Sequence, residues 1–102
     1  APARAELVHE AIALHTSLVA ARRAPEVALV HLGAGLDVIG YHAEEVARPT
    51  VDAVCARWPR LDFKREICPL LAREAAATPR SPVGLQWRLG FARRIARAPF
   101  AD

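Results

Sequence analysis

Asp37 is a carboxylate inside an apolar stretch of the chain. From Val27 to Gly40 no other residue is charged at neutral pH, and nearly all are apolar. A helix that is apolar on all sides is usually buried, and a buried carboxylate needs a metal ion, a cation or several hydrogen-bond donors to remain charged. Two interpretations of Asp37 therefore stay open, a metal ligand and a salt bridge to one of the thirteen arginines.

Two glycines flank Asp37 at helical spacing. Gly33 precedes it by four residues and Gly40 follows it by three, which places all three on one face of a helix. Glycine costs about 1 kcal/mol relative to alanine within a helix, so these positions need a packing or functional reason. They leave room for a neighbouring helix, or for a ligand, a water molecule or a metal ion beside the acid.

His15 is the histidine best placed for chemistry. It shares a helix face with Ala11 and Ile12, and the helix is expected to end just after it. An imidazole at a helix C-terminus can serve as a ligand or a proton carrier, whereas a core histidine bonded to a backbone carbonyl is the alternative. His31 lies six residues before Asp37, which points the two to different faces, and we interpret it as a packing residue.

The two cysteines indicate no metal or redox motif. Cys55 and Cys68 are thirteen residues apart, without a CxxC motif or a histidine at zinc-ligand spacing. We interpret them as buried thiols, with a disulfide as the lesser alternative. No apolar stretch has the roughly 18 residues that cross a bilayer, and no signal-peptide pattern opens the chain, so we expect a cytoplasmic protein without membrane contact.

The net charge of +3 is unevenly distributed, because the C-terminal part is basic. After residue 78 a single acid, Asp102, accompanies five arginines, which are Arg80, Arg88, Arg93, Arg94 and Arg97. Nucleic acid or an anionic membrane could bind such a helix. However, Trp87 and Phe91 fall on its apolar side, as core residues do. A solvated basic face is favoured, and nucleic-acid binding is the weaker alternative.

Helices must position these residues, because no segment shows the strict alternation of a strand. Pro25 opens the central helix, Gly40 ends it, Asp62 is a suitable N-cap, and Pro69 predicts a kink. The expected helices cover about residues 3–17, 26–40, 49–58, 63–77 and 83–98. We therefore predict one all-α domain over residues 1–102, a compact bundle of about five helices around a buried central helix.

Three segments together resemble the C-terminal half of the HD-domain superfamily, in the branch similar to cyanamide hydratase. They are Glu10-Ala-Ile-Ala-Leu-His-Thr16, Pro25-Glu-Val-Ala-Leu-Val-His-Leu-Gly-Ala-Gly-Leu-Asp-Val-Ile-Gly40 and Trp58-Pro-Arg-Leu-Asp-Phe-Lys64. The resemblance covers about residues 5–77, and the central string is its specific part.

The resemblance implies a metal-dependent hydrolase or hydratase acting on a small phosphoester or a nitrile such as cyanamide. In that superfamily a histidine, a His-Asp pair and a final aspartate hold a divalent metal that activates water. Asp37 matches the final aspartate, His15 is implied as a catalytic acid/base and Thr16 as a substrate contact. The chain contains no His-Asp pair, so we expect the other ligands on helices before Ala1, with Fe, Mn or Zn as the metal.

A second expectation follows from the missing helices. Without them the central helix would leave an apolar patch exposed, which favours homodimerisation. The alternative function is a non-catalytic all-α interaction module, in which Asp37 pairs with an arginine and the apolar face forms the dimer.

Overall fold

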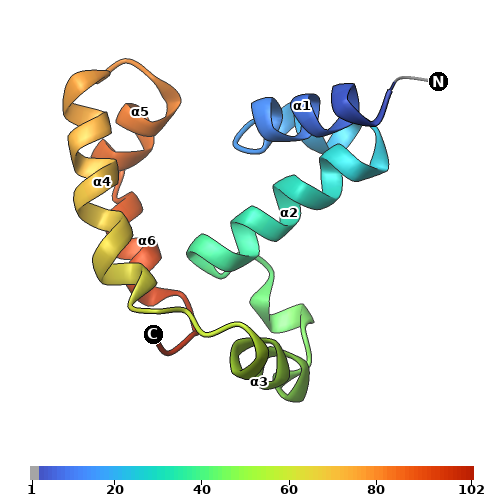
Figure 1. The fold of residues 1–102 in the computed structure, drawn as a ribbon. Coiled ribbons are helices and arrows are strands. Elements are labelled where there is room, and N and C mark those ends of the chain that lie inside the picture. Colours follow the sequence, from blue (N-terminus) through green and yellow to red (C-terminus); the bar gives the residue numbers. More distant parts are fainter. Residues whose placement is uncertain (1–2) are drawn as a thin grey trace.

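The computed structural model describes residues 3–102, and all regular secondary structure in this range is helical. Figure 1 shows the arrangement, and no strand occurs in this range. The α-helices are α1 (Arg4–Leu14), α2 (Pro25–Ile39), α3 (Arg48–Arg57), α4 (Phe63–Ala77), α5 (Pro82–Arg88) and α6 (Phe91–Arg97). Two short 3₁₀ turns cover Leu18–Arg22 and Ala43–Glu45. The predicted all-α bundle is confirmed.

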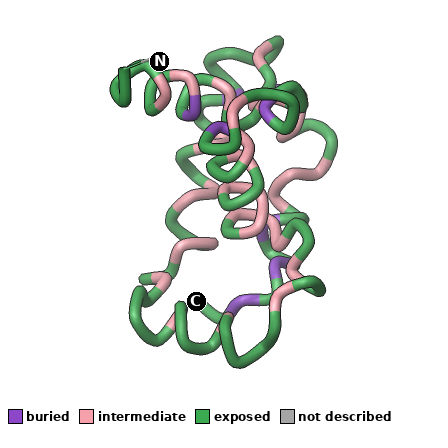
Figure 2. The backbone as a smooth tube through the Cα atoms, turned by 90° about the vertical axis from the view of Figure 1, so that its right-hand side faces the viewer, coloured by how far each residue is buried: buried purple, intermediate pink, exposed green. Residues whose placement is uncertain are grey.

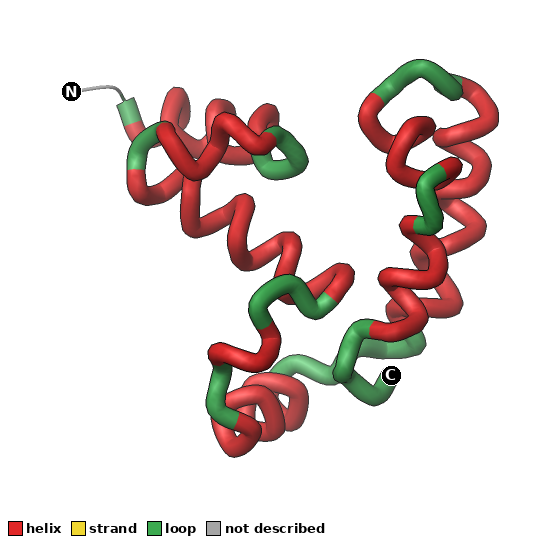
Figure 3. The backbone as a smooth tube through the Cα atoms, turned by 180° about the vertical axis from the view of Figure 1, so that it is seen from behind, coloured by secondary structure: helices red, strands yellow, loops and turns green. Residues whose placement is uncertain are grey.

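The helices form two groups that α2 connects. In the first group α1 and the 3₁₀ turn at Leu18–Arg22 pack against α2, and in the second α4, α5 and α6 pack against one another. Contacts between α2 and α6 join the groups, and Figure 3 shows the same two groups from behind. Helix α3 lies at the end of the molecule between them and packs closely against none of the other helices in the described range.

Local sequence signals explain the ends of α2. Pro25 occupies the first turn, where its missing N–H would have had no partner. Gly40 ends the helix in the left-handed region at φ 69°, and its N–H donates to the carbonyl of Leu36 at 2.9 Å. A residue with a Cβ is disfavoured in that region, which is why glycine commonly ends helices. The predicted limits of the central helix are thus confirmed.

Two local predictions are wrong. The expected helix over residues 83–98 is two helices, because Gly90 adopts φ 92° and breaks the hydrogen-bond ladder between α5 and α6. Asp62 precedes α4 as expected, but its backbone is left-handed and its side chain caps no N–H of the helix. The carboxylate of Asp102 takes that place instead, accepting from the N–H of Lys64 at 2.7 Å.

The expectation that α2 is buried on all sides is also corrected. Val27 is fully buried and packs with Ala11 and Ala20, but Leu29 is 67% exposed and Leu32 is 43% exposed. The elements that contact α2 cover one side of it, and Figure 2 shows the buried backbone as short, separated stretches. None of the helices in residues 3–102 has the length and hydrophobicity that a membrane span requires.

Candidate functional site

Asp37 is paired with an arginine from a distant loop. It lies in the last turn of α2, whereas Arg60 lies in the loop between α3 and α4. Nη1 of Arg60 donates to Oδ1 of Asp37 at 2.6 Å, and Nη2 donates to the Asp37 backbone carbonyl at 3.1 Å. The Asp37 side chain is 62% exposed, so the acid is not buried as the sequence suggested. Of the two interpretations, the structure shows the salt bridge.

Arg60 is the centre of a larger cluster. Its side chain is only 8% exposed, and its Nε donates to Oδ1 of Asp102 at 3.3 Å. The guanidinium also lies over the rings of Phe63 and Phe100, 5.0 Å and 4.9 Å from their centroids. Cations over aromatic faces are attracted by the ring quadrupole. Arg60 therefore holds the end of α2, the start of α4 and the C-terminal segment together.

A groove of about 400 Å³ lies beside this cluster. Its walls come from α2, α3, the loops that follow them, the start of α4 and the C-terminal segment, and its charged lining residues are Asp37 and Arg60. The remaining lining residues are mainly apolar, namely Gly33, Leu36, Val46, Thr50, Val51, Val54, Cys55, Trp58, Pro59, Phe63 and Phe100. An apolar concavity with a few convergent polar groups is typical of a binding site.

His15 and Thr16 lie outside this groove. His15 caps the C-terminal end of α1, and its Nδ1 is 2.6 Å from the carbonyl oxygen of Ile12. Nδ1 of His31 is 2.7 Å from the carbonyl oxygen of His15. Because His31 and Asp37 are six residues apart on α2, about 9 Å along its axis, this contact keeps His15 one to two turns away from Asp37. The structure does not bring the three predicted site residues together.

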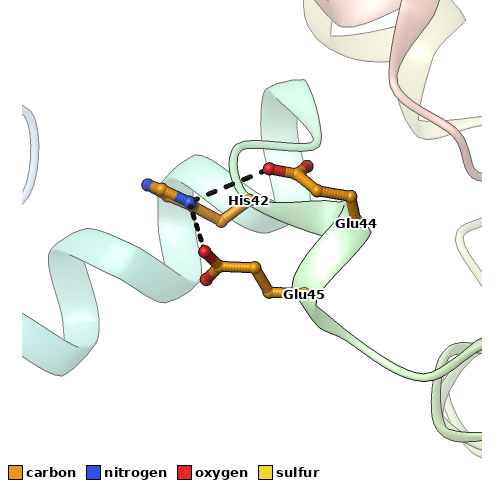
Figure 4. Close-up of side chains that lie close together, drawn as sticks. All are labelled: His42, Glu44 and Glu45. Carbon is orange, nitrogen blue, oxygen red and sulfur yellow. Dashed lines mark ion pairs between the residues drawn. The ribbon is translucent and has the colours of Figure 1, made fainter.

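A different group of side chains has metal-ligand geometry. Within residues 3–102, His42, Glu44 and Glu45 are the histidine and acid side chains whose ligand atoms converge (Figure 4). Nδ1 of His42 is 3.3 Å from Oε1 of Glu45 and 4.0 Å from Oε1 of Glu44. All three are exposed, and His42 directly precedes the 3₁₀ turn that contains Glu44 and Glu45, so ion pairs between neighbouring residues explain their proximity.

Asp37 thus supplies one ligand and no more. No group of three potential ligands in the described range includes it, whereas catalytic metal sites usually have three or four protein ligands. The residues present do not by themselves fit a catalytic metal. Cys55 and Cys68 are both free thiols and half-buried, so the disulfide alternative is not observed.

The basic C-terminal helices have the orientation that the sequence predicted. Ile95 is fully buried and Trp87 and Phe91 are half-buried, while Arg93, Arg94 and Arg97 are exposed. The aromatic rings are therefore part of the packing rather than of an arginine-lined surface.

Sequence reasoning found Asp37 but missed its partners. Arg60 is 23 residues from Asp37 and Asp102 is 42 residues from Arg60. No local spacing connects them, and the expected burial of Asp37 indicated only that a metal ion, a cation or several hydrogen-bond donors would lie near it. Comparison of this chain with known protein families, curated proteins and solved structures gives no match.

Proposed function

We propose that this chain is the C-terminal helical part of an HD-type metal-dependent hydrolase or hydratase, and that Asp37 is one of its metal ligands. The observation that carries the proposal is the exposed Asp37 carboxylate at the edge of the groove. Arg60 engages Oδ1, and no hydrogen bond from the described residues engages Oδ2. An oxygen in that position is available to a cation.

Arg60 supports this role because it orients the carboxylate. Carboxylates that bind metals are commonly held by a second hydrogen bond, which fixes their direction. The charge balance is also suitable, since Asp37, Asp102 and Arg60 sum to one negative charge. The ammonium of Lys64 is directed at the carbonyls of Ala96 and Ala98, at 3.3 Å and 2.8 Å, and so is engaged elsewhere.

The proposal requires further helices. The HD resemblance assigns the other ligands to a histidine and a His-Asp pair, which this chain lacks, so another segment or a partner chain must provide them. The metal would be Fe, Mn or Zn, and bound metal would supply an activated water for attack on a small phosphoester or a nitrile. His15 as acid/base and Thr16 as substrate contact belong to the same proposal and depend on those helices.

A second candidate function is a non-catalytic interaction module. It is favoured by the Asp37–Arg60 pair, which accounts for the acid without any metal, and by the apolar side chains exposed on α1 and α2. In this case Asp37 is a structural residue, and the exposed apolar face forms a homodimer.

Metal content distinguishes the two functions. We would express the complete open reading frame that encodes this chain and compare the wild type with Asp37→Asn by elemental analysis. Asp52→Asn is the matched control. The Asp52 side chain is 61% exposed, close to the exposure of Asp37, and it pairs with an arginine, Arg48, at 3.1 Å.

We expect wild type and Asp52→Asn to contain close to one Fe, Mn or Zn ion per chain, and Asp37→Asn to have lost it with unchanged circular dichroism. A wild type without metal, or an Asp37→Asn variant that retains it, would exclude Asp37 as a ligand and leave the interaction module.

A further inference from the structure

Gly33 is a glycine that the chain itself does not explain. A Cβ built at Gly35, Gly40 or Gly84 would lie within 3.3 Å of a neighbouring residue, and Gly90 has a positive φ. Gly33 lies inside α2 with helical backbone, and a Cβ there would meet nothing within 4 Å. Alanine would be about 1 kcal/mol more favourable at such a position. No contact within the described residues therefore requires a glycine there, and the space beside Gly33 belongs to the groove that Asp37 and Arg60 also line.

The helix face around Gly33 is apolar and exposed. Leu29 is 67% exposed and Val30 is 43% exposed, and both share this face because they precede Gly33 by four and three residues. Asp37 is the charged side chain within four residues of Gly33 on this face, and Arg60 already pairs with it. Because Arg60 also pairs with Asp102, this cluster carries one net negative charge at one end of a face that is otherwise apolar.

This face connects two concave regions. On one side it continues into the groove that Asp37 and Arg60 line. On the other side Val30 also lines a shallow groove of about 470 Å³ between α1 and α2, where Val8 and Ile12 are 58% and 62% exposed. The apolar surface therefore runs along α2 from one groove to the other.

The solvent-accessible area of the chain is larger than that of a typical folded monomer of this mass. The chain exposes 7651 Å², whereas a folded monomer of 11.1 kDa exposes about 5,700 Å². The difference is about 2,000 Å² per chain, but it is spread over the whole molecule, because Leu18, Leu61 and Leu89 are also more than 80% exposed. If half of it lies on this face, two chains would share an interface of about 2,000 Å² in total, the lower end of the range for obligate homodimers. The radius of gyration, 14.7 Å against about 13 Å for this length, agrees with an open arrangement.

We propose that a second copy of this chain covers this face, with the two α2 helices crossing at Gly33. In a two-fold dimer the same patch meets itself, so a residue at the crossing point contacts its own counterpart. Small residues at such a point allow two helix backbones to approach closely, which explains Gly33. The dimer does not depend on a metal ion, so a failed metal test leaves it standing, and a monomeric chain leaves the metal proposal standing.

The test is the oligomeric state of the 102-residue protein, measured by sedimentation equilibrium over a wide range of concentrations. We expect the wild type to have twice the chain mass of 11.1 kDa. Gly33→Leu fills the open space at the crossing in both copies, and we expect it to weaken dimerisation at least about 30-fold, which corresponds to about 2 kcal/mol. Ala76→Leu, which adds similar bulk on an exposed position of α4, should dimerise as the wild type does.

Gly33→Leu should remain folded, because its side chain enters open space and leucine favours helix more than glycine does. Circular dichroism checks this. A second variant tests the crossing point directly: with Cys55 and Cys68 changed to alanine, Gly33→Cys should form a disulfide-linked dimer on oxidation, and Ala76→Cys should not. A monomeric wild type, or a Gly33→Leu variant that dimerises as tightly as the wild type, would overturn the proposal.

Discussion

Replacing Arg60 by methionine tests how much the contacts of Arg60 with Asp37, Asp102 and the two phenylalanine rings stabilise the fold. Methionine keeps an unbranched apolar stem but removes the guanidinium. The variant loses the bonds to Asp37 and its carbonyl at 2.6 Å and 3.1 Å, the bond to Asp102 at 3.3 Å, and the cation–π contacts with Phe63 and Phe100. Because the Arg60 side chain is 8% exposed, water replaces these contacts poorly.

The largest loss comes from Asp102. Its side chain is 17% exposed, and without Arg60 its carboxylate keeps only the N–H of Lys64 as a donor. The variant therefore loses a charge-assisted hydrogen bond, which contributes about 1.5–3 kcal/mol to stability. The pair with Asp37 contributes less, about 0.5 kcal/mol, because Asp37 is 62% exposed and solvent screens the charges. The carbonyl bond and the ring contacts add about 1 kcal/mol each.

Methionine recovers most of the aromatic packing, so we expect Arg60→Met to lower the free energy of unfolding by about 3–4 kcal/mol. For a chain of this size that lowers Tm by about 12–32 °C. Thermal and urea unfolding, followed by circular dichroism at one fixed protein concentration, measure both quantities. The fixed concentration matters because dimerisation makes apparent stability concentration-dependent.

Double-mutant cycles separate the two acids. Combined with Asp102→Asn, Arg60→Met should show a coupling energy of about 1.5 kcal/mol, and combined with Asp37→Asn one below about 0.5 kcal/mol. A loss below about 1 kcal/mol for Arg60→Met alone, or a larger coupling to Asp37 than to Asp102, would refute the reasoning from burial.

Two backbone predictions have controls within the chain. Gly40→Ala should lower the free energy of urea unfolding more than Gly90→Ala. Both variants place alanine at positive φ, which costs about 1–2 kcal/mol. A Cβ at Gly40 would also lie 2.5 Å from Cδ of Pro99, whereas a Cβ at Gly90 would meet nothing within 4 Å. Equal costs would mean that the Pro99 contact relaxes freely. Ser81→Ala should cost about 1 kcal/mol, because its Oγ accepts from the N–H of Gly84 at 3.1 Å and donates to the Thr78 carbonyl at 2.6 Å. Ser17→Ala removes only a 3.4 Å bond and should cost less. The reverse order would show that these caps do not control stability.

The fold was predicted well where the signals are local. Proline in the first turn and glycine at the end set the limits of α2, and apolar spacing placed Trp87 and Phe91 on the packed side of the C-terminal helices. The break at Gly90 was missed, because a glycine within an otherwise periodic segment is compatible with a continuous helix until packing imposes a positive φ. The capping of α4 was misassigned to Asp62, since the residue that accepts from Lys64 comes from the far end of the chain.

The sequence by itself determined that the chain is all-α, because helical periodicity is a local property. It also singled out Asp37, but the burial on which its need for a partner rested was wrong, since the Asp37 side chain is 62% exposed. Only the tertiary structure shows that Arg60 forms the salt bridge with Asp37 and that Asp102 pairs with the same arginine. It also shows that α2 is uncovered around Gly33. Any of thirteen arginines could pair with Asp37 on charge alone. Which one does so depends on where the loop between α3 and α4 meets the end of α2, and that position is set by the packing of helices far apart in the chain.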